Sequence, residues 1–285
     1  MSNVPAVDLK LLTNEQKEYA AIVLNETIEN RDKKIEEIRE WLLNNKELCA
    51  RTDDNFILIF LRGCKFKVEK VKLKLRNFHH QRAVMTEWFS NRNPILPELT
   101  ELFDLGVFLP LRKLDDEGRL VVIIKASVHD PRKHKFSDVI KAGMMILDVA
   151  TRDDVSVSLH GIAAILDLKS VTLSHALQLT PNVIKQLVHS WQSCYPFRIG
   201  YLYFINAPIY VNVVLNVFKS FMNEKLRKRI HIHRKGIAEK ISPNILPIEY
   251  GGNEGSISNL KDHWKKVAEE NADWFSENEK YKLLI

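Results

Sequence analysis

The chain has 285 residues, 45% of them hydrophobic and 27% charged, which are the proportions of a globular protein with an ample core. Lysine and arginine number 42 against 36 aspartates and glutamates, and the resulting net charge of +6 suits an anionic membrane surface or a nucleic acid. The sequence has no aromatic-laced basic groove of the kind that binds single strands, so we expect no nucleic-acid partner.

The first residues predict no targeting signal. Residues 1–16 contain no basic region followed by an apolar core, so we expect no signal peptide. No run of about 20 apolar residues predicts a membrane span either. Cys49, Cys64 and Cys194 lie far apart and lack C-x-x-C spacing, which favours reduced thiols. We therefore expect a cytoplasmic protein.

Residues 1–95 predict an all-helical N-terminal module. Thr52, Asp53 and Asp54 are candidate N-caps for the apolar run at 56–62, and Gly63 is placed to end that helix. Apolar residues then recur at helical spacing from 71 to 89, until Asn93-Pro94 stops the pattern.

From about residue 96 the composition changes, and apolar runs that predict strands alternate with helical patterns. This alternation predicts an α/β fold with a mostly parallel sheet and flanking helices. The division would give a second domain at 96–255 and a C-terminal helical tail at 256–285. The expected strands are 120–124, 162–168, 202–205 and 230–233, and the expected helices are 136–153, 182–194 and 260–275.

Residues 209–222 predict a helix that is apolar around most of its circumference. Its polar residues fall at steps of four, three and four, which is one thin stripe on a helix. Such a helix is either a core helix or a lid over a lipid-filled cavity, and the pattern alone does not choose. A dense group of cations follows it. The polar stripe consists of Asn212, Asn216, Lys219 and Asn223. The cations are Lys225, Arg227, Lys228 and Arg229.

Recognisable catalytic motifs are absent from the sequence, including the phosphate-binding loop, the nucleophile elbow and H-E-x-x-H. His231 and His233 would share one face of a strand and, with Cys194 or His189, could form a metal site, but a structural function is favoured. Asp167 ends a strand, where a hydrogen-bonding function is favoured over catalysis. We expect neither an enzyme nor a metal protein.

A series of short motifs occurs in a fixed order along the second half of the chain. By these motifs residues 50–260 resemble the CRAL-TRIO (Sec14-like) lipid-binding family. The likeness is closest to the branch of α-tocopherol transfer protein, cellular retinaldehyde-binding protein and the clavesins. The motifs are LDL at 166–168, SHA at 174–176, Thr180-Pro181, YPFR at 195–198, FINAP at 204–208, RIHIH at 229–233 and LPIEYGG at 246–252.

The resemblance implies a hydrophobic pocket between the sheet and a gate helix at about 207–222. It implies no cofactor other than a bound hydrophobic ligand, such as a tocopherol, a retinoid or a similar lipid. Ser190 and Tyr195 would be its polar groups, able to orient a hydroxyl or an aldehyde. The implied pocket residues are Ile140, Gly143, Leu147, Ile162, Leu166, Leu179, Leu187, Ser190, Tyr195 and Leu202. The implied gate residues are Ile209, Val213, Val214, Val217, Phe218 and Phe221.

The resemblance also implies a phosphoinositide-binding patch at Arg198, Lys225 and Arg229. Cys64 stands where the family has a further arginine, although Lys65 is adjacent. If the gate helix continued to them, Lys225 and Arg229 would share a face. Two functions remain open. One is binding and intermembrane transfer of a lipid, and the other is a phosphoinositide-binding trafficking adaptor of the clavesin type that transfers no cargo. Either implies transient association with membranes or endosomes.

Overall fold

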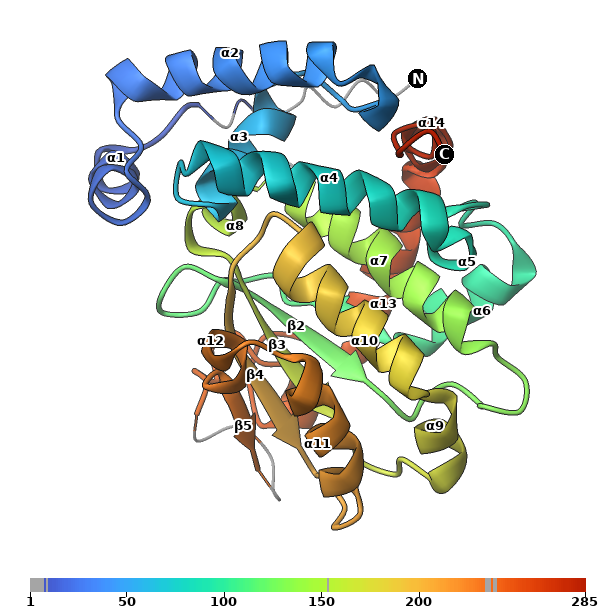
Figure 1. Cartoon of the computed structure of the whole chain (residues 1–285). Helices are drawn as coiled ribbons and strands as arrows, with labels where there is room; N and C mark the ends of the chain where they lie inside the picture. Colours follow the sequence, from blue (N-terminus) through green and yellow to red (C-terminus); the bar gives the residue numbers. More distant parts are fainter. Residues whose placement is uncertain (1–7, 9, 153, 234–236, 238–239) are drawn as a thin grey trace.

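The structure is a computed structural model that describes residues 8, 10–152, 154–233, 237 and 240–285. A layer of N-terminal helices lies along one end of a five-stranded sheet, and further helices cover both faces of that sheet (Figure 1). No helix of the described residues is long and apolar enough to cross a membrane.

The N-terminal module is helical, as the sequence predicts. Asp53 caps its third helix by accepting a hydrogen bond from the Phe56 backbone at 3.0 Å. The predicted helix that runs to residue 89 is divided in two at Met85, whose backbone is not helical. The helices are α1 (Asn14–Tyr19), α2 (Ile28–Asn44), α3 (Asp54–Gly63), α4 (Val68–Val84), α5 (Thr86–Phe89) and α6 (Pro97–Leu105).

The sheet has the order β1-β2-β3-β4-β5, with β2 to β5 parallel and β1 antiparallel to β2. The mostly parallel sheet is thus confirmed. The sequence did not predict β1, because three residues ending in a proline give no alternating pattern. The strands are β1 (Phe108–Pro110), β2 (Leu120–Lys125), β3 (Ile162–Asp167), β4 (Ile199–Ile205) and β5 (Ile230–Ile232).

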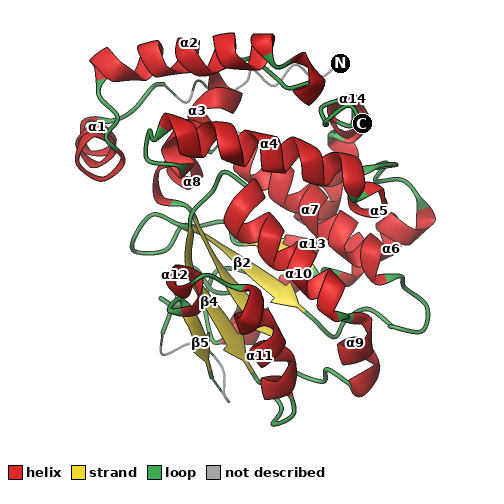
Figure 2. Cartoon of the chain, viewed as in Figure 1, coloured by secondary structure: helices red, strands yellow, loops and turns green. Residues whose placement is uncertain are grey.

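Helices bury both faces of the sheet (Figure 2). Successive residues of β2 point to opposite faces, so Val122 packs toward α10 and α11, whereas Ile123 packs toward α13. The helices of this part are α7 (Phe136–Arg152), α8 (Val155–His160), α9 (Leu173–Gln178), α10 (Pro181–His189), α11 (Val211–Phe221), α12 (Glu224–Arg227), α13 (Ile257–Glu270) and α14 (Ala272–Asn278).

Two predicted helices are shorter than expected. The helix expected at 182–194 begins as α10 but continues from Ser190 to Cys194 as a wider π-helical turn. The helix expected at 260–275 is interrupted at Asn271, which separates α13 from α14. In both cases the apolar spacing continues across the break, so hydrophobic periodicity could not reveal it.

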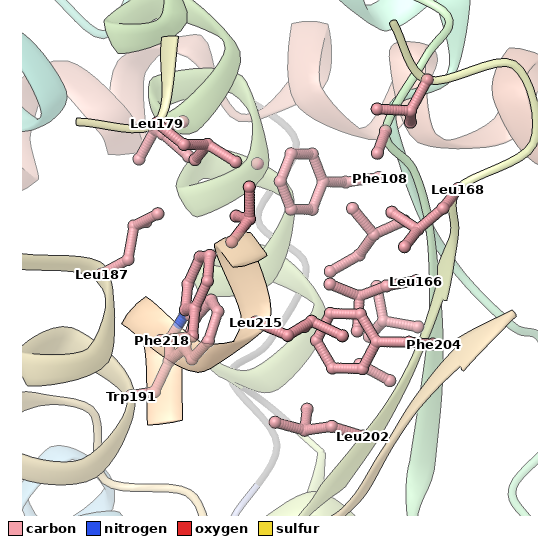
Figure 3. A pocket seen from close by; sticks show the side chains of 18 of the residues that line it. Phe108, Leu166, Leu168, Leu179, Leu187, Trp191, Leu202, Phe204, Leu215 and Phe218 are labelled. Atoms are coloured by element: carbon pink, nitrogen blue, oxygen red, sulfur yellow. The ribbon is translucent and has the colours of Figure 1, made fainter. Parts of the chain in front are cut away.

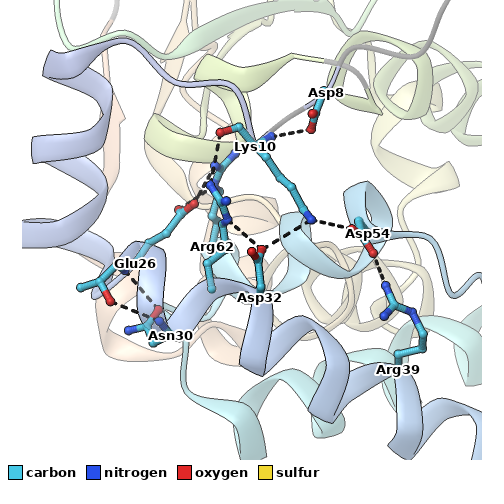
Figure 4. A network of polar contacts seen from close by, with 10 residues as sticks. Asp8, Lys10, Glu26, Asn30, Asp32, Arg39, Asp54 and Arg62 are labelled. Atoms are coloured by element: carbon cyan, nitrogen blue, oxygen red, sulfur yellow. Dashed lines mark hydrogen bonds and ion pairs between the residues drawn. The ribbon is translucent and has the colours of Figure 1, made fainter.

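A buried ion pair within the N-terminal module holds the arginine that joins the module to the rest of the chain. Arg62 of α3 donates two hydrogen bonds to the Glu26 carboxylate, at 2.7 and 2.8 Å, and a third to the Ser158 hydroxyl of α8 at 2.8 Å. Figure 4 shows Glu26 meeting Arg62 beside α2. The adjacent Gly63 has no room for a side chain, because a Cβ there would lie 1.6 Å from the Pro196 carbonyl oxygen. The module is therefore packed tightly against the segment that precedes β4.

Candidate functional site

A cavity of about 190 Å³ lies between α11 and the sheet, with α7 and α10 closing its sides. Figure 3 shows side chains from several of these elements converging on it. The wall is almost wholly apolar. Its aliphatic and aromatic members include Phe108, Val122, Ile140, Leu147, Leu166, Leu187, Leu202, Phe204, Leu215 and Phe218.

Strand and helix periodicity place these residues on the wall. Leu202 and Phe204 are two apart on β4 and therefore face the same side of the sheet. On α7, Ile140 and Leu147 lie on the inner face, with Gly143 between them. A Cβ on Gly143 would lie 2.4 Å from the Phe108 ring, so the glycine makes room for that ring.

Most of the predicted pocket positions lie on this wall. They are Ile140, Gly143, Leu147, Ile162, Leu166, Leu179, Leu187 and Leu202.

The two predicted polar groups, Ser190 and Tyr195, do not line this cavity. Ser190 is buried and donates a hydrogen bond to Gln81 of α4 at 2.9 Å. Tyr195 lines a second cavity of about 110 Å³ beside Arg82. The π-helical turn at 190–194 packs on α4 and turns both residues away from α11, which corrects their expected position.

Several wall residues were not predicted, above all His129 and His175. His175 belongs to the SHA motif at 174–176, but that motif alone did not predict a position on the cavity wall. His129 lies in the loop before α7, where the sequence has no periodic pattern that could indicate which side chains point inward.

The helix α11 covers the cavity with one face and exposes the other. Val214 and Phe218 line the cavity, and Phe218 stacks on Trp191 with 5.9 Å between ring centroids. Val217 and Phe221 are partly buried against the same core. Ile209 and Val213, in contrast, are 85% and 71% exposed, so these two predicted gate residues point away from the cavity. Ile209 precedes the first helical turn, and Val213 lies opposite the inward row Val211, Leu215 and Phe218.

Exposed apolar side chains gather beside this helix. Leu173 and Leu177 of α9 are 69% and 71% exposed. The Tyr210 hydroxyl donates a hydrogen bond to the Val171 carbonyl and so ties the start of α11 to the segment before α9. We call Leu173, Leu177, Ile209 and Val213 the apolar patch. Exposed apolar patches of this kind mark contacts with other proteins or with membranes.

The cations that follow α11 do not continue its helix. The helix ends at Phe221, and Asn223 caps the separate helix α12, which carries Lys225. Arg229 follows α12 and donates a hydrogen bond to the Ile199 carbonyl. The condition for a shared face of one continuous helix is therefore not met, because the chain turns at residues 222–223.

These cations nevertheless lie close enough to affect one another. Burial lowers the pKa of Lys225, and the positive charges of Arg229, Lys65, Arg198 and Lys70 lower it further. Cys64, which stands where the family has arginine, is buried. The structure thus brings residues of the N-terminal module to Arg198 and Arg229. We call Lys65, Lys70, Arg198, Lys225 and Arg229 the cationic cluster.

The other side chains that the sequence suggests as metal ligands or catalytic groups make contacts within the fold. Within the described residues, no group of three or more histidine, cysteine or acidic side chains could hold a metal ion. His231 and His233 both pack on the Tyr203 ring, at 5.1 and 5.2 Å between centroids. Asp167 accepts hydrogen bonds from the Tyr250 hydroxyl and the Asn206 amide, each at 2.8 Å.

Comparison with known proteins gives a consistent family match. Residues 105–252 match the model of the CRAL/TRIO domain, and residues 27–99 match one described as Pinta-like, UBA domain. Clavesin-2 of Mus musculus is 30% identical over 245 residues, which cover 85% of this chain and 75% of that protein. Clavesin-1 of Pongo abelii is 29% identical over 245 residues, covering 85% and 69%. The crystal structure of Sfh5 has the same fold, with a TM-score of 0.57 at 15% identity over 82% of this chain and 92% of that one.

Proposed function

The chain belongs to the CRAL/TRIO domain family, and on that premise we propose that it takes up a small hydrophobic lipid beneath α11 and transfers it between membranes. Lipid binding in general follows from the family, and a tocopherol, a retinoid or a similar lipid is our proposal for the cargo. The observation that carries the proposal is the almost wholly apolar cavity. Removing apolar ligand surface from water lowers the free energy by about 25 cal/mol per Å². Because the ligand gains this in the cavity and in a bilayer alike, the free energy of transfer between the two is close to zero.

We propose that α11 is the gate of this cavity and that the apolar patch enters the membrane surface. The supporting observation is that one helix separates the cavity from a strongly exposed apolar face. A bilayer that receives Ile209 and Val213 could stabilise an open position of the same helix, and water could not. Association with membranes or endosomes would then be transient, and we expect no catalytic turnover.

We further propose that the cationic cluster binds a phosphoinositide headgroup. Arg198 and Arg229 already donate to the Leu159 and Ile199 carbonyls, and their remaining N–H groups can donate to a phosphate, with the lysines adding charge around them. The same cluster supports a second candidate function, a phosphoinositide-binding trafficking adaptor that transfers no cargo, because headgroup binding needs no occupied cavity. The similarity to clavesins is compatible with both functions.

Native mass spectrometry of protein purified from its own organism, followed by organic extraction, tests the cargo directly. We expect one small hydrophobic molecule per chain. Leu215→Trp, which fills the cavity, should lose that molecule, whereas Val213→Trp on the exposed face of the same helix should keep it. Wild-type protein that is always empty but still binds membranes would overturn the transfer function in favour of the adaptor.

Vesicle binding tests the cationic cluster. The double variant Lys225→Glu with Arg229→Glu should bind vesicles containing phosphatidylinositol bisphosphate at least about tenfold more weakly, since each surface cation contributes about 1 kcal/mol. Added salt should weaken wild-type binding as well. Lys265→Glu with Lys266→Glu makes the same change of net charge on α13, which packs against β1 at the sheet edge opposite β5. Equal loss in both double variants would exclude a localised headgroup site.

A further inference from the structure

The cavity wall carries few polar atoms, and most of them already have partners within the protein. The polar side chains on the wall are His129, His175, Trp191 and Tyr210. The Tyr210 hydroxyl donates to the Val171 carbonyl, and because the residue is 46% exposed, its oxygen can accept hydrogen bonds from water. His175 contacts the His129 carbonyl through Nε2, at 3.0 Å, and Thr172 through Nδ1. Trp191 can only donate a hydrogen bond. His129 is therefore the candidate hydrogen-bond acceptor for a ligand in this cavity.

The hydrogen bonds of Gln178 determine which nitrogen of His129 carries the proton. The Gln178 amide nitrogen donates to the carbonyl oxygens of Pro131 and His134, at 3.2 and 3.0 Å. Carbonyl oxygens only accept, so the orientation of the amide is set, and its oxygen faces His129 Nε2 at 2.9 Å. That oxygen also only accepts, so Nε2 bears the hydrogen. In the neutral ring, Nδ1 is then an acceptor.

The ring of His129 is buried, which favours its neutral form. Its side chain is only 4% exposed, and burial lowers its pKa despite the hydrogen bond to Gln178. The neighbouring His175 and His134 also oppose a positive charge on it. Among the described residues, Nδ1 has no hydrogen-bond partner and almost no accessible surface, so a ligand hydroxyl reaches it when neighbouring side chains of the wall shift. A buried acceptor without a partner costs free energy, which a ligand that supplies a donor would recover.

We propose that His129 Nδ1 accepts a hydrogen bond from a hydroxyl group of the bound lipid, so that the cavity selects lipid alcohols or phenols. This inference rests on the proposed lipid-binding function and narrows its substrate class. Aldehydes, ketones, esters and ethers only accept hydrogen bonds and cannot satisfy an acceptor. An ammonium group could donate, but its charge would be expensive to bury among apolar side chains. An ionised fatty acid has no donor.

Three ligands with the same tail isolate this contact. Hexadecanol, hexadecanal and hexadecyl methyl ether compete with the apolar dye Nile red for the full-length protein, and dye fluorescence reports displacement. A single hydrogen bond predicts that hexadecanol binds the wild type about three to ten times more tightly than the other two.

Two substitutions remove the acceptor in different ways. His129→Gln places an amide that can still reach Gln178 but leaves no atom at the position of Nδ1. His129→Phe keeps a ring of similar size and serves if the glutamine variant does not fold. Either should bring hexadecanol down to the affinity of the ether without changing the affinity of the ether. His263→Phe, a histidine on α13 that does not line the cavity, should keep the wild-type preference.

The outcomes separate this inference from the function on which it rests. Equal binding of the three ligands by the wild type, or a preference for the alcohol that survives in both His129 variants, would overturn the contact and leave the lipid cavity standing. If neither the dye nor any of the three ligands binds the wild type, the cavity does not hold lipid, and both proposals fall together.

Discussion

At the scale of single residues, His79 makes the stability of the fold depend on pH. The side chain is fully buried among aromatic rings, and burial lowers its pKa from the usual 6.5 to about 4, even though Nδ1 contacts the Leu75 carbonyl. The unfolded chain takes up a proton near pH 6.5, and the folded chain does not. The free energy of unfolding should therefore fall by about 3 kcal/mol as the pH is lowered from 6.5 to 4.

Chemical denaturation at a series of pH values measures this dependence. His79→Leu should reduce the slope between pH 6.5 and 4. A smaller slope should remain, because burial also lowers the pKa of His129, His160 and His189. A variant with the full wild-type slope would show that His79 does not titrate as its surroundings predict.

A second prediction at this scale concerns Gly143. Replacing a helical glycine by alanine normally stabilises a protein by about 1 kcal/mol. Here the added methyl would meet the Phe108 ring, so we expect Gly143→Ala to lower the melting temperature and to reduce cargo binding. Gly143→Ala combined with Phe108→Leu should recover part of the stability. A fully stable single variant would show that the ring can move aside.

The residues of the cavity also show what sequence can and cannot predict. Apolar positions such as Ile140 and Leu202 follow from helix and strand periodicity, which survives small errors in element boundaries. Ser190 and Tyr195 were misplaced because one wide turn rotates them toward α4. His129 could not be found at all, because its position depends on a loop and on the amide of Gln178, which is distant in sequence.

At the scale of elements, the two faces of α11 should separate cargo binding from membrane binding. Ile209→Ser with Val213→Ser should weaken binding to phosphatidylcholine vesicles about tenfold or more, because partial burial of each side chain contributes on the order of 1 kcal/mol. Cargo retained in detergent should be unchanged.

A control double variant tests whether the position of the exposed apolar side chains determines vesicle binding. Ile22→Ser with Leu73→Ser removes two other strongly exposed apolar side chains, 73% and 60% exposed, from the N-terminal module. Vesicle binding of this variant should equal that of the wild type. Comparable losses in both variants would mean that general surface hydrophobicity, not the apolar patch, drives membrane binding.

Element type was easier to predict than element ends. The strands β2, β3 and β4 and the helices α7 and α11 follow from composition and period alone. The ends of α4, α10 and α11 depend on single backbone turns at Met85, Ser190 and Met222, where apolar spacing continues past the break. The turn at Met222 has the largest consequence, since it moves Lys225 onto a separate helix and changes how the cationic cluster is assembled.

At the scale of the whole molecule, the parallel sheet could be predicted because strands and helices alternate, but the docking of the N-terminal module could not. Arg62 joins the module to Ser158 of the body, 96 residues away along the chain, and Glu26, 36 residues away within the module, holds the Arg62 side chain. Charged residues are rarely buried, so no composition rule marks these as interior. The cationic cluster shares this dependence, since Lys65 and Lys70 come from the module and Arg198 comes from the body.

Breaking the buried pair should weaken the fold of the module, and it should weaken docking through the hydrogen bond from Arg62 to Ser158. Glu26→Gln leaves the Arg62 charge buried without its carboxylate, which should lower the free energy of unfolding by about 3–5 kcal/mol. Glu26→Met with Arg62→Met should cost less than Glu26→Gln, because no buried charge remains. Glu224→Gln, which removes one partner of an exposed pair with Lys228, should change stability little.

Vesicle binding by Glu26→Gln tests whether the docked module is needed to assemble the cationic cluster. Glu26→Gln raises the net charge by one, so electrostatic attraction alone predicts slightly stronger binding to vesicles that contain phosphatidylinositol bisphosphate. If the module must be docked to bring Lys65 and Lys70 to Arg198, binding should instead weaken at temperatures where the variant remains folded, although every cation of the cluster is intact. Stronger binding would show that the body carries the headgroup site without the module.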